Sequence, residues 1–304
     1  LMGNTIVWKP ASSSVYSGYY LMKLFQDAGL PNGVINFLPG SGSQIGNTVM
    51  ENENLAGIHF TGSTSVFQSM WKKVGENIHK YKTYPRIVGE TGGKDFILAH
   101  PSSDIKSLAT AMVRGAYEYQ GQKCSAASRC YIPSRIWDDV KKEFLSQVSS
   151  IKMGDVKDFT NFVNAVIDNA AFDNISSYID YAQKSNEAEI ICGGEYDKSK
   201  GYFIEPTIIL TNNPNFKTMV EEIFGPVITI FVYKKEKWEE TLNLVDQTSE
   251  YALTGAVFSI DRHAIELATS ILENAAGNFY INDKPTGAVV GQQPFGGSRG
   301  SGTN

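Results

Sequence analysis

The sequence is poor in cysteine, in charged residues and in long apolar runs. Its three cysteines are Cys124, Cys130 and Cys192, and an odd number of thiols indicates a reducing compartment rather than a disulfide framework. No apolar run approaches the roughly 20 residues that a membrane-spanning helix needs. Lysine and arginine are dispersed and the net charge is −5. We therefore expect neither nucleic acid nor a membrane surface as a partner.

The chain also lacks a recognisable targeting signal, an internal repeat and a low-complexity linker. It begins Leu1-Met2-Gly3-Asn4, without the charged and apolar start of a secretory signal or the Arg/Ser-rich composition of a transit peptide. It stops just after a glycine-rich turn, at Gly302-Thr303-Asn304. From both ends we expect a piece of a longer protein.

What the chain does contain is a regular alternation of short apolar strands and amphipathic helices. With 304 residues, of which 42% are hydrophobic and 19% charged, it is large enough for two globular domains. In the first 90 residues the pattern predicts strands at 5–8, 34–38, 55–60 and 86–89, with helices at 12–25 and 64–80 between them. This rhythm predicts an α/β fold with a parallel sheet and right-handed crossovers.

A second alternating block runs from Asp95 to about Ala276. Apolar spacing predicts helices at 105–119, 137–148, 172–182, 239–246 and 264–272, and strands at 227–232, 255–258 and 278–281. The change from one block to the next falls near residues 91–94, at Gly92-Gly93.

Ligands of parallel sheets bind outside the carboxyl ends of the strands. In the first block these ends carry Lys9, Gly40-Ser41-Gly42, Thr61-Gly62-Ser63 and Glu90-Thr91-Gly92-Gly93. A single polar or glycine turn of this kind is usually an ordinary loop. Four of them at strand ends predict one crevice that all four turns face. The spacing of Gly40, Gly42 and Gly46 differs from the G-x-G-x-x-G fingerprint, so a dinucleotide fold here would be an atypical one.

Cys124 lies in a glycine-containing turn between a predicted helix and a predicted strand. A thiol in such a turn can be exposed and approached by backbone N–H groups, which favours a reactive thiolate. The alternative is a small buried apolar residue, and the local sequence alone favours this alternative. Glu90 at a strand end is either a surface carboxylate or a general base. A thiol nucleophile and a carboxylate base across a cleft suit covalent acyl chemistry, and a nicotinamide cofactor would turn it into oxidation.

The sequence resembles the aldehyde dehydrogenase superfamily. The motifs that match come in the family's order and together span essentially the whole chain. The matching motifs are Trp8-Lys9-Pro10, Phe60-Thr61-Gly62-Ser63, Glu90-Thr91-Gly92-Gly93-Lys94, Gly121-Gln122-Lys123-Cys124, Glu221-Glu222-Ile223-Phe224-Gly225-Pro226-Val227 and Pro294-Phe295-Gly296-Gly297-Ser298. Further segments around 122–126, 275–284 and 286–295 resemble the branch that oxidises L-glutamate γ-semialdehyde to L-glutamate with NAD in proline breakdown.

The resemblance implies a role for individual residues. Cys124 would be the nucleophile and Glu90 the base that activates the hydrolytic water. NAD would be held by Lys9 at the adenosine ribose and by Glu222 at the nicotinamide ribose, with Phe224 packing nearby; the alternatives are a salt-bridged loop carboxylate for Glu222 and plain core for Phe224. The pyrophosphate would meet a helix N-terminus formed by Gly62, Ser63, Thr64, Ser65 and Val66. No metal site is implied.

The resemblance also implies how the substrate is held. Its α-carboxylate would take hydrogen bonds from the Ser125 hydroxyl and from the backbone N–H groups of Gly287 and Ala288, and Phe295 would wall the aliphatic part. Serine is usual in the family where this chain has Ala288, so we expect weaker substrate binding. We attach no role to Thr91.

The implied architecture is an NAD-binding domain at 1–91, a catalytic α/β domain at 92–285, and a substrate-anchor loop with a return segment at 286–304. The family's oxyanion-stabilising asparagine precedes Leu1, and its C-terminal segment, which helps build the subunit interface, lies beyond Asn304. By resemblance, the full-length protein would be a homo-oligomer of the mitochondrial matrix. The alternatives are another semialdehyde dehydrogenase, a catalytically silent relative, and a thioester hydrolase without cofactor.

Overall fold

Strands and helices alternate through the first part of the chain, as the sequence predicts. The computed structural model describes residues 3–303 and divides them into two compact units. The first unit runs to His59 and resumes over Ser65–Ile87; the second comprises Phe60–Thr64 and the chain from Val88 onward. The elements up to residue 90 are β1 (Ile6–Trp8), η1 (Ser12–Ser14), α1 (Val15–Asp27), β2 (Ile35–Phe37), α2 (Gly42–Met50), β3 (Gly57–Thr61), α3 (Thr64–Glu76), η2 (Ile78–Lys80) and β4 (Arg86–Glu90).

The pairing of these strands differs from the single sheet that the alternation suggests. Within residues 3–303, β1 pairs with β2 in one parallel two-stranded sheet and β3 pairs with β4 in another. Alternation sets the order of elements but does not specify which strands are neighbours. In the first unit, α1 packs closely on β2, because a Cβ atom at Gly18 would come 2.9 Å from the ring of Phe37.

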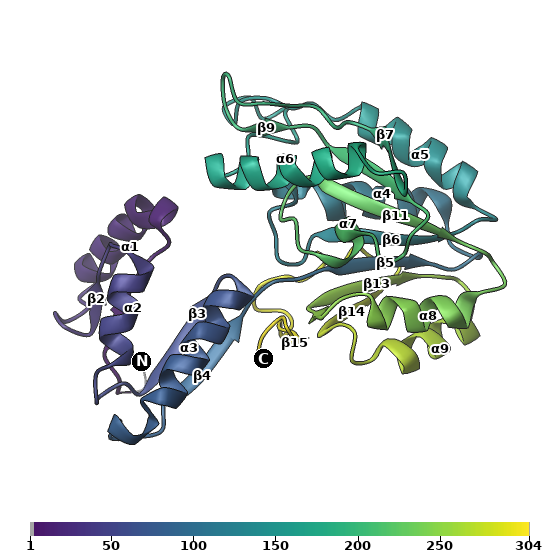
Figure 1. Ribbon diagram of the computed structural model, residues 1–304. Coiled ribbons are helices and arrows are strands. Elements are labelled where there is room, and N and C mark those ends of the chain that lie inside the picture. Colours follow the sequence, from purple (N-terminus) through teal and green to yellow (C-terminus); the bar gives the residue numbers. More distant parts are fainter. Residues whose placement is uncertain (1–2, 304) are drawn as a thin grey trace. The chain divides into compact units, whose positions relative to one another are not determined.

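The second unit is built on a larger sheet (Figure 1). Within the described residues it has seven strands in the order β14-β13-β5-β6-β11-β10-β7, all parallel to their neighbours except the edge strand β7. Its strands are β5 (Asp95–Ala99), β6 (Ala127–Pro133), β7 (Ala188–Cys192), β10 (Thr207–Thr211), β11 (Val227–Tyr233), β13 (Thr254–Phe258) and β14 (Asn278–Ile281). The remaining strands form two small pairs, β8 (Tyr196–Asp197) with β9 (Phe203–Ile204) and β12 (Tyr251–Ala252) with β15 (Ser298–Arg299).

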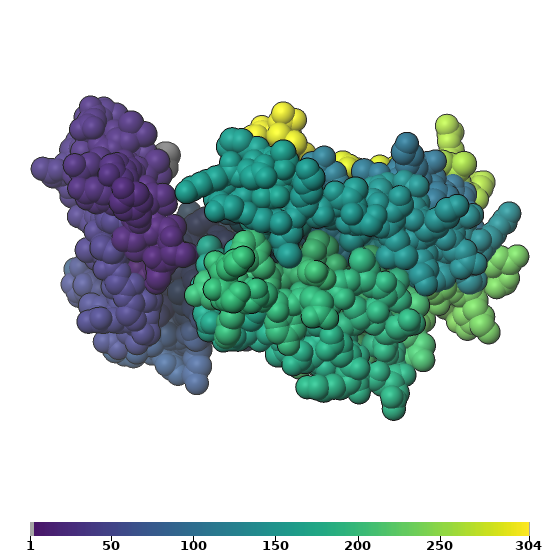
Figure 2. Space-filling model, turned by 90° about the horizontal axis from the view of Figure 1, so that it is seen from above, coloured from purple at the N-terminus to yellow at the C-terminus, as the bar shows by residue number. Residues whose placement is uncertain are grey.

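Helices cover both faces of this sheet. They are α4 (Ile105–Tyr117), η3 (Glu118–Gly121), α5 (Trp137–Ser149), α6 (Asn169–Gln183), α7 (Lys217–Val220), α8 (Trp238–Gln247) and α9 (Arg262–Leu272). Alternate residues of β5 point to opposite faces: Phe96 and Leu98 pack in one core with α6, α8 and α9, whereas Ile97 and Ala99 pack in the other with α4 and α5. Figure 2 shows this unit's face built mainly from teal and green residues of the middle of the chain, while the central strands are buried.

Burial on both faces explains why the strands of this sheet are continuous apolar runs. Each fully buried Leu, Ile or Phe side chain stabilises the fold by roughly 1.5–3 kcal/mol, so the sheet is a rigid support for the loops at its ends. None of the helices within residues 3–303 combines the length and the apolar character that crossing a membrane requires.

Candidate active site

Cys124 lies in a turn between η3 and β6, at the position that the sequence predicts. Three consecutive residues before it, Tyr119, Gln120 and Gly121, have left-handed backbone conformations with φ of 54°, 57° and 65°. Glycine is required at the last of them, because a Cβ atom at Gly121 would lie 2.2 Å from the carbonyl oxygen of Gly225. The turn is also tied to the rest of the unit through Gln122, whose Oε1 accepts a 2.9 Å hydrogen bond from the N–H of Ile167.

The Cys124 side chain lies between the two alternatives for this turn, an exposed thiolate and a buried apolar residue. Cys124 is partly buried, and burial is the main reason that the pKa of its thiol is raised to about 12. The carboxyl groups of Asp95, Glu90 and Glu222 raise this pKa as well, because negative charge disfavours a thiolate. The structure therefore brings the two predicted carboxylates close to the predicted nucleophile, but it holds the sulfur as a thiol.

Glu90 is the last residue of β4, and its backbone is fixed from two sides. The N–H of Gly62 donates to the Glu90 carbonyl at 3.2 Å, and Glu90 forms an isolated antiparallel bridge with Gly302. The next residue, Thr91, makes two bonds that the sequence did not predict: its N–H donates to Ser301 O at 2.8 Å and its Oγ1 donates to Gly300 O at 2.7 Å. Thr91 thus fastens the end of the strand that carries Glu90.

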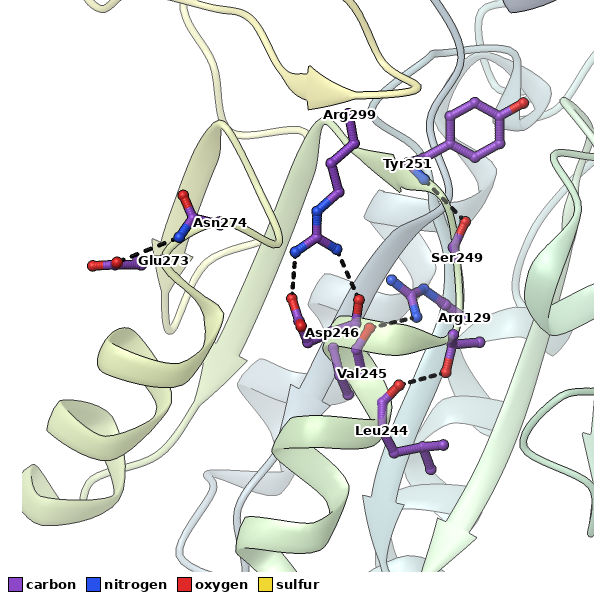
Figure 3. Close-up of polar contacts among 10 residues, drawn as sticks. Arg129, Leu244, Val245, Asp246, Ser249, Tyr251, Glu273, Asn274 and Arg299 are labelled. Atoms are coloured by element: carbon purple, nitrogen blue, oxygen red, sulfur yellow. Dashed lines mark hydrogen bonds and ion pairs between the residues drawn. The ribbon is translucent and has the colours of Figure 1, made fainter.

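The segment 298–303, which we name the return segment, makes further bonds in the second unit. Gly300 O also accepts from Thr64 Oγ1 at 3.1 Å, and Ser301 Oγ accepts from the N–H of Ala252 at 3.0 Å. Arg299 donates two hydrogen bonds to Asp246, from Nη1 to the carbonyl oxygen at 2.8 Å and from Nη2 to Oδ1 at 2.6 Å (Figure 3). The return segment therefore links Thr64 and the end of β4 to the end of α8.

Glu222 is seated against the two glycines that follow Glu90 and Thr91. Its Oε1 accepts a 2.9 Å hydrogen bond from the N–H of Gly93. A Cβ atom at Gly92 would come 2.7 Å from Glu222 Oε2, and one at Gly93 would come 2.1 Å from the Cys124 carbonyl oxygen. The glycine pair thus lies between the Glu222 carboxylate and the backbone of Cys124, directly after Glu90 and Thr91.

Phe224 is 44% exposed and has a φ of 59°, so the alternative that it belongs to the core is wrong. Its neighbours are buried: Ile223 is in the core, and a Cβ atom at Gly225 would come 2.6 Å from Ile175 Cδ1. The backbone of Phe224 is left-handed between two buried residues, and its exposed ring is accessible to a ligand.

Behind the glycine pair lies a layer of buried polar residues that the sequence analysis missed. Lys94 Nζ donates to Ser128 Oγ at 2.5 Å. Asp95 Oδ1 accepts from both the N–H and the Oγ1 of Thr254, at 2.7 and 2.9 Å. Arg129 Nε donates to Lys94 O at 2.7 Å, and its Nη1 reaches Val245 O at 3.0 Å (Figure 3). Adjacency to the Glu90–Gly93 motif is the signal that could have drawn attention to Lys94 and Asp95.

This layer lies at the amino-terminal edge of the large sheet. β5 begins at Asp95, β6 at Ala127 and β13 at Thr254, so the candidate residues precede these strands. Open α/β sheets usually bind ligands at the opposite, carboxyl edge. In the second unit, Glu90 at the end of β4 and the residues Gly62, Ser63 and Thr64 after β3 follow the expected pattern.

Asp95 gives a prediction about stability and pH. Burial raises the pKa of Asp95 to about 8, so the folded chain keeps a proton that the unfolded chain loses above about pH 4. Stability supplied by this group is present below about pH 4 and is lost as the pH rises towards about 8. Asp95→Asn should therefore be more stable than the wild type, by a margin that grows from pH 5 to pH 8 and reaches on the order of 1 kcal/mol or more. Urea unfolding at both pH values checks this, and a margin independent of pH would contradict it.

The residues predicted to hold NAD fall in both units, and each group is described by itself. In the first unit, Lys9 Nζ lies 3.7 Å from where a Cβ atom of Gly42 would be, at the start of α2. Two residues, Gly62 and Ser63, lead from β3 into α3, whose first residues are Thr64, Ser65 and Val66. A helix N-terminus suits a phosphate; here the Gly62 N–H is bonded to Glu90 O and the Thr64 hydroxyl to Gly300 O. In the second unit, the seated Glu222 carboxylate is an acceptor that suits a ribose hydroxyl, and the Phe224 ring is exposed.

The residues predicted to hold the substrate lie just before β6 and in the loop after β14. Ser125 is buried, and its carbonyl oxygen accepts from Thr254 Oγ1 at 3.4 Å. Gly115 of α4 allows the loop after β14 to approach β6, since its Cβ atom would lie 3.1 Å from Ala127 Cβ and 3.5 Å from Pro285 Cδ. Gly287, Ala288 and Phe295 are partly exposed in this loop. Their meeting with a substrate stays a prediction.

Within the described residues, no group of three or more His, Cys, Asp or Glu side chains could hold a metal ion. The second unit thus places the Cys124 thiol among the carboxyl groups of Asp95, Glu90 and Glu222.

Comparison with known proteins defines the class. The family model of the aldehyde dehydrogenases, which describes their sequences, matches residues 1–304. The chain belongs to this family.

Particular relatives are similar over the whole chain. It is 58% identical over 306 residues to the mitochondrial Δ1-pyrroline-5-carboxylate dehydrogenase of Dictyostelium discoideum, covering 100% of this chain and 55% of that protein. It is 48% identical over 305 residues to the human mitochondrial enzyme of the same name, covering 100% and 54%. The NAD-bound structure of the Mycobacterium tuberculosis enzyme has a TM-score of 0.93 and 48% identity, covering 100% and 55%. The chain spans about half the length of the curated relatives it matches.

Proposed function

We propose that this chain carries the catalytic cysteine and general base of an NAD-dependent dehydrogenase that oxidises L-glutamate γ-semialdehyde to L-glutamate. The observation that carries the proposal is the placement of the Cys124 thiol near the carboxyl groups of Glu90 and Glu222, beside the Gly92–Gly93 pair. The similarity to Δ1-pyrroline-5-carboxylate dehydrogenases, one of them bound with NAD, supports the choice of substrate and cofactor.

In the proposed mechanism, Cys124 Sγ bonds to the aldehyde carbon, and the thiol proton passes to the carboxylates or to solvent. When bound, NAD supplies the acceptor for the hydride of that carbon. Glu90 then takes a proton from water, whose oxygen attacks the resulting thioester carbonyl and releases glutamate and the Cys124 sulfur. The N–H of Cys124 is a donor for the developing oxyanion, and one such donor is typically worth about 10²–10³ in rate.

The roles of the chain's parts belong to the same proposal. Residues 1–91 would bind NAD through Lys9 and the Gly62–Val66 turn, and residues 92–285 would carry the chemistry. Residues 286–304 would anchor the α-carboxylate of the substrate and return to Glu90. Several relatives are named mitochondrial, which supports a location in the mitochondrial matrix. We also propose that the full-length protein is a homo-oligomer.

A titration followed by a turnover assay tests the proposal. NAD is added while the fluorescence of Trp8 and the other tryptophans is followed, and L-glutamate γ-semialdehyde is then added while NADH absorbance is recorded. Saturable binding with turnover supports the function. Thioester hydrolysis without NAD, in a protein that forms no NADH from the semialdehyde, would favour a hydrolase instead. A folded protein that binds no NAD would contradict the proposal.

Ala288 gives a prediction about substrate affinity. A hydroxyl group at this position would add a hydrogen bond to the α-carboxylate beside the backbone N–H. Ala288→Ser is therefore expected to lower KM for the semialdehyde several-fold, by about 0.5–1.5 kcal/mol of binding, with little change in kcat. Steady-state kinetics on both proteins measure it. An unchanged or raised KM would count against this loop as the carboxylate anchor.

A further inference from the structure

Thr91, directly after Glu90, is a buried residue with a polar side chain. It is 3% exposed, its N–H donates to Ser301 O at 2.8 Å, and its hydroxyl donates to Gly300 O at 2.7 Å. The Gly300 carbonyl oxygen accepts a second hydroxyl, that of Thr64, at 3.1 Å. Removing the Thr91 hydroxyl would therefore loosen one link to the return segment without leaving a buried acceptor unpaired.

The backbone on the other side of Glu90 is tied to the return segment as well. The N–H of Gly89 donates to Thr303 Oγ1, and the N–H of Thr303 donates to Gly89 O, both at 3.0 Å. Between these bonds and those of Thr91, Glu90 lies opposite Gly302 in an antiparallel bridge. A Cβ atom at Gly302 would come 2.3 Å from Gly89 O, so the two backbones approach closely. The return segment therefore fixes the place of the Glu90 backbone.

The Thr91 hydroxyl acts on Glu90 through the backbone that joins the two residues. Along β4, buried and more exposed residues alternate; Thr91 continues the buried set, whereas Glu90 is partly exposed. Successive side chains of an extended chain point to opposite faces, so the Thr91 hydroxyl faces the return segment and the Glu90 carboxyl faces away from it. A displacement of about 1 Å can cost on the order of 10² in rate, which makes this backbone tie important for a general base.

We propose that Thr91 is a positioning residue for the general base: its two bonds to the return segment hold the Glu90 carboxyl where it takes a proton from the water that attacks the thioester. The inference rests on the proposed function, in which Glu90 is that base. In this step the water oxygen bonds to the thioester carbon, the carbon–sulfur bond breaks, and Glu90 passes its proton to the departing sulfur or to solvent. The hydride transfer that forms NADH precedes this step. Loosening Thr91 should therefore slow the release of glutamate and spare the first formation of NADH.

The test compares variants of the full-length protein that contains this chain. Thr91→Val removes the hydroxyl at nearly constant volume, and Thr91→Ser keeps it. Thr303→Val loosens the backbone on the other side of Glu90, as a second variant should Thr91→Val not fold. The matched control is Thr211→Val, because Thr211 is 4% exposed and its hydroxyl donates to Glu187 O at 2.8 Å. It ends β10, at the edge of the large sheet opposite the candidate site.

Enzyme, NAD and L-glutamate γ-semialdehyde are mixed rapidly, and NADH absorbance is followed through the first turnover into the steady state. For Thr91→Val we expect a first turnover close to that of the wild type and a steady-state rate lowered about tenfold, because the base is displaced and not removed. Protein quenched with acid in the steady state should carry more glutamyl thioester on Cys124 than the wild type, by mass spectrometry. Thr303→Val should show the same pattern. Thr91→Ser and Thr211→Val should behave like the wild type.

A loss of first-turnover and steady-state NADH by the same factor in Thr91→Val would overturn the inference, because it would show fewer folded active sites instead of a slower hydrolysis. A slow steady state without added thioester on Cys124 would overturn it too, as would a Thr91→Ser protein as slow as Thr91→Val. A Thr91→Val protein that turns over like the wild type would overturn the inference and leave the proposed function standing. A wild-type protein that forms no NADH from the semialdehyde would overturn the proposed function, and the role of Thr91 with it.

Discussion

Cys124→Ala is expected to form no NADH from L-glutamate γ-semialdehyde while still binding NAD. In the proposed mechanism the sulfur is the atom to which the substrate bonds, and removing a nucleophile of this kind typically lowers kcat by at least about a thousandfold. NAD binding should stay within about twofold of the wild-type dissociation constant, because the proposed cofactor contacts come from Lys9, the Gly62–Val66 turn and Glu222. Fluorescence titration and NADH absorbance measure the two quantities on any preparation in which the wild type turns over.

The matched control is Cys192→Ala. Cys192 is a partly buried thiol on the edge strand β7 and lies outside the candidate site. Its replacement should leave turnover close to that of the wild type. Substantial NADH formation by Cys124→Ala, or equal loss in both variants, would contradict the assignment of Cys124 as the nucleophile.

Gly93→Ala is expected to destabilise the second unit strongly. The new Cβ atom would lie 2.1 Å from the Cys124 carbonyl oxygen and 2.6 Å from Asp95 Oδ2. Both obstacles are held in place, since Cys124 lies in a fixed turn and Asp95 is bonded to Thr254. The backbone must shift, so we expect the free energy of unfolding to fall by about 3 kcal/mol or more. NAD binding should weaken too, because the Gly93 N–H orients Glu222.

Gly75→Ala is the control for a methyl group added where there is room. Gly75 lies in α3, and no heavy atom of the described residues falls within 4 Å of its Cβ position. Alanine is the better helix former by roughly 0.5–1 kcal/mol, so this variant should be unchanged or slightly more stable. Urea unfolding of both variants measures the contrast. A Gly93→Ala protein as stable as the wild type would contradict the close approach at the site.

The sequence predicts much of the fold because the central strands of the second unit are buried on both faces. Their apolar runs at 227–232 and 255–258 correspond to β11 and β13, and the amphipathic segments correspond to α4, α5, α6, α8 and α9. The antiparallel edge strand β7 has no fully buried residue, so its pattern carries little signal. The separate pairing of β1 with β2 and of β3 with β4 depends on neighbours in space, which alternation does not encode.

The candidate site, like the fold, could be predicted from the sequence only in part. Cys124, Glu90 and Glu222 could be singled out because each stands in a motif at the end of an element. The roles of Lys94, Asp95 and Arg129 could not, because charged residues are ordinarily taken to lie on the surface. The high pKa of the Cys124 thiol was also missed, since it arises from burial and from three carboxyl groups. Thr91 gave no signal because its partner, Gly300, lies 209 residues further along the chain.

That separation has a consequence for the order in which the molecule is assembled. The bonds from Thr64 and Thr91 to Gly300, and from the Gly89 N–H to Thr303, close loops of 236, 209 and 214 residues. Contacts so distant along the chain are slow to form, because the entropy of loop closure is lost before the contact is gained. During synthesis, the end of β4 that carries Glu90 therefore cannot take its final place until the return segment has been made.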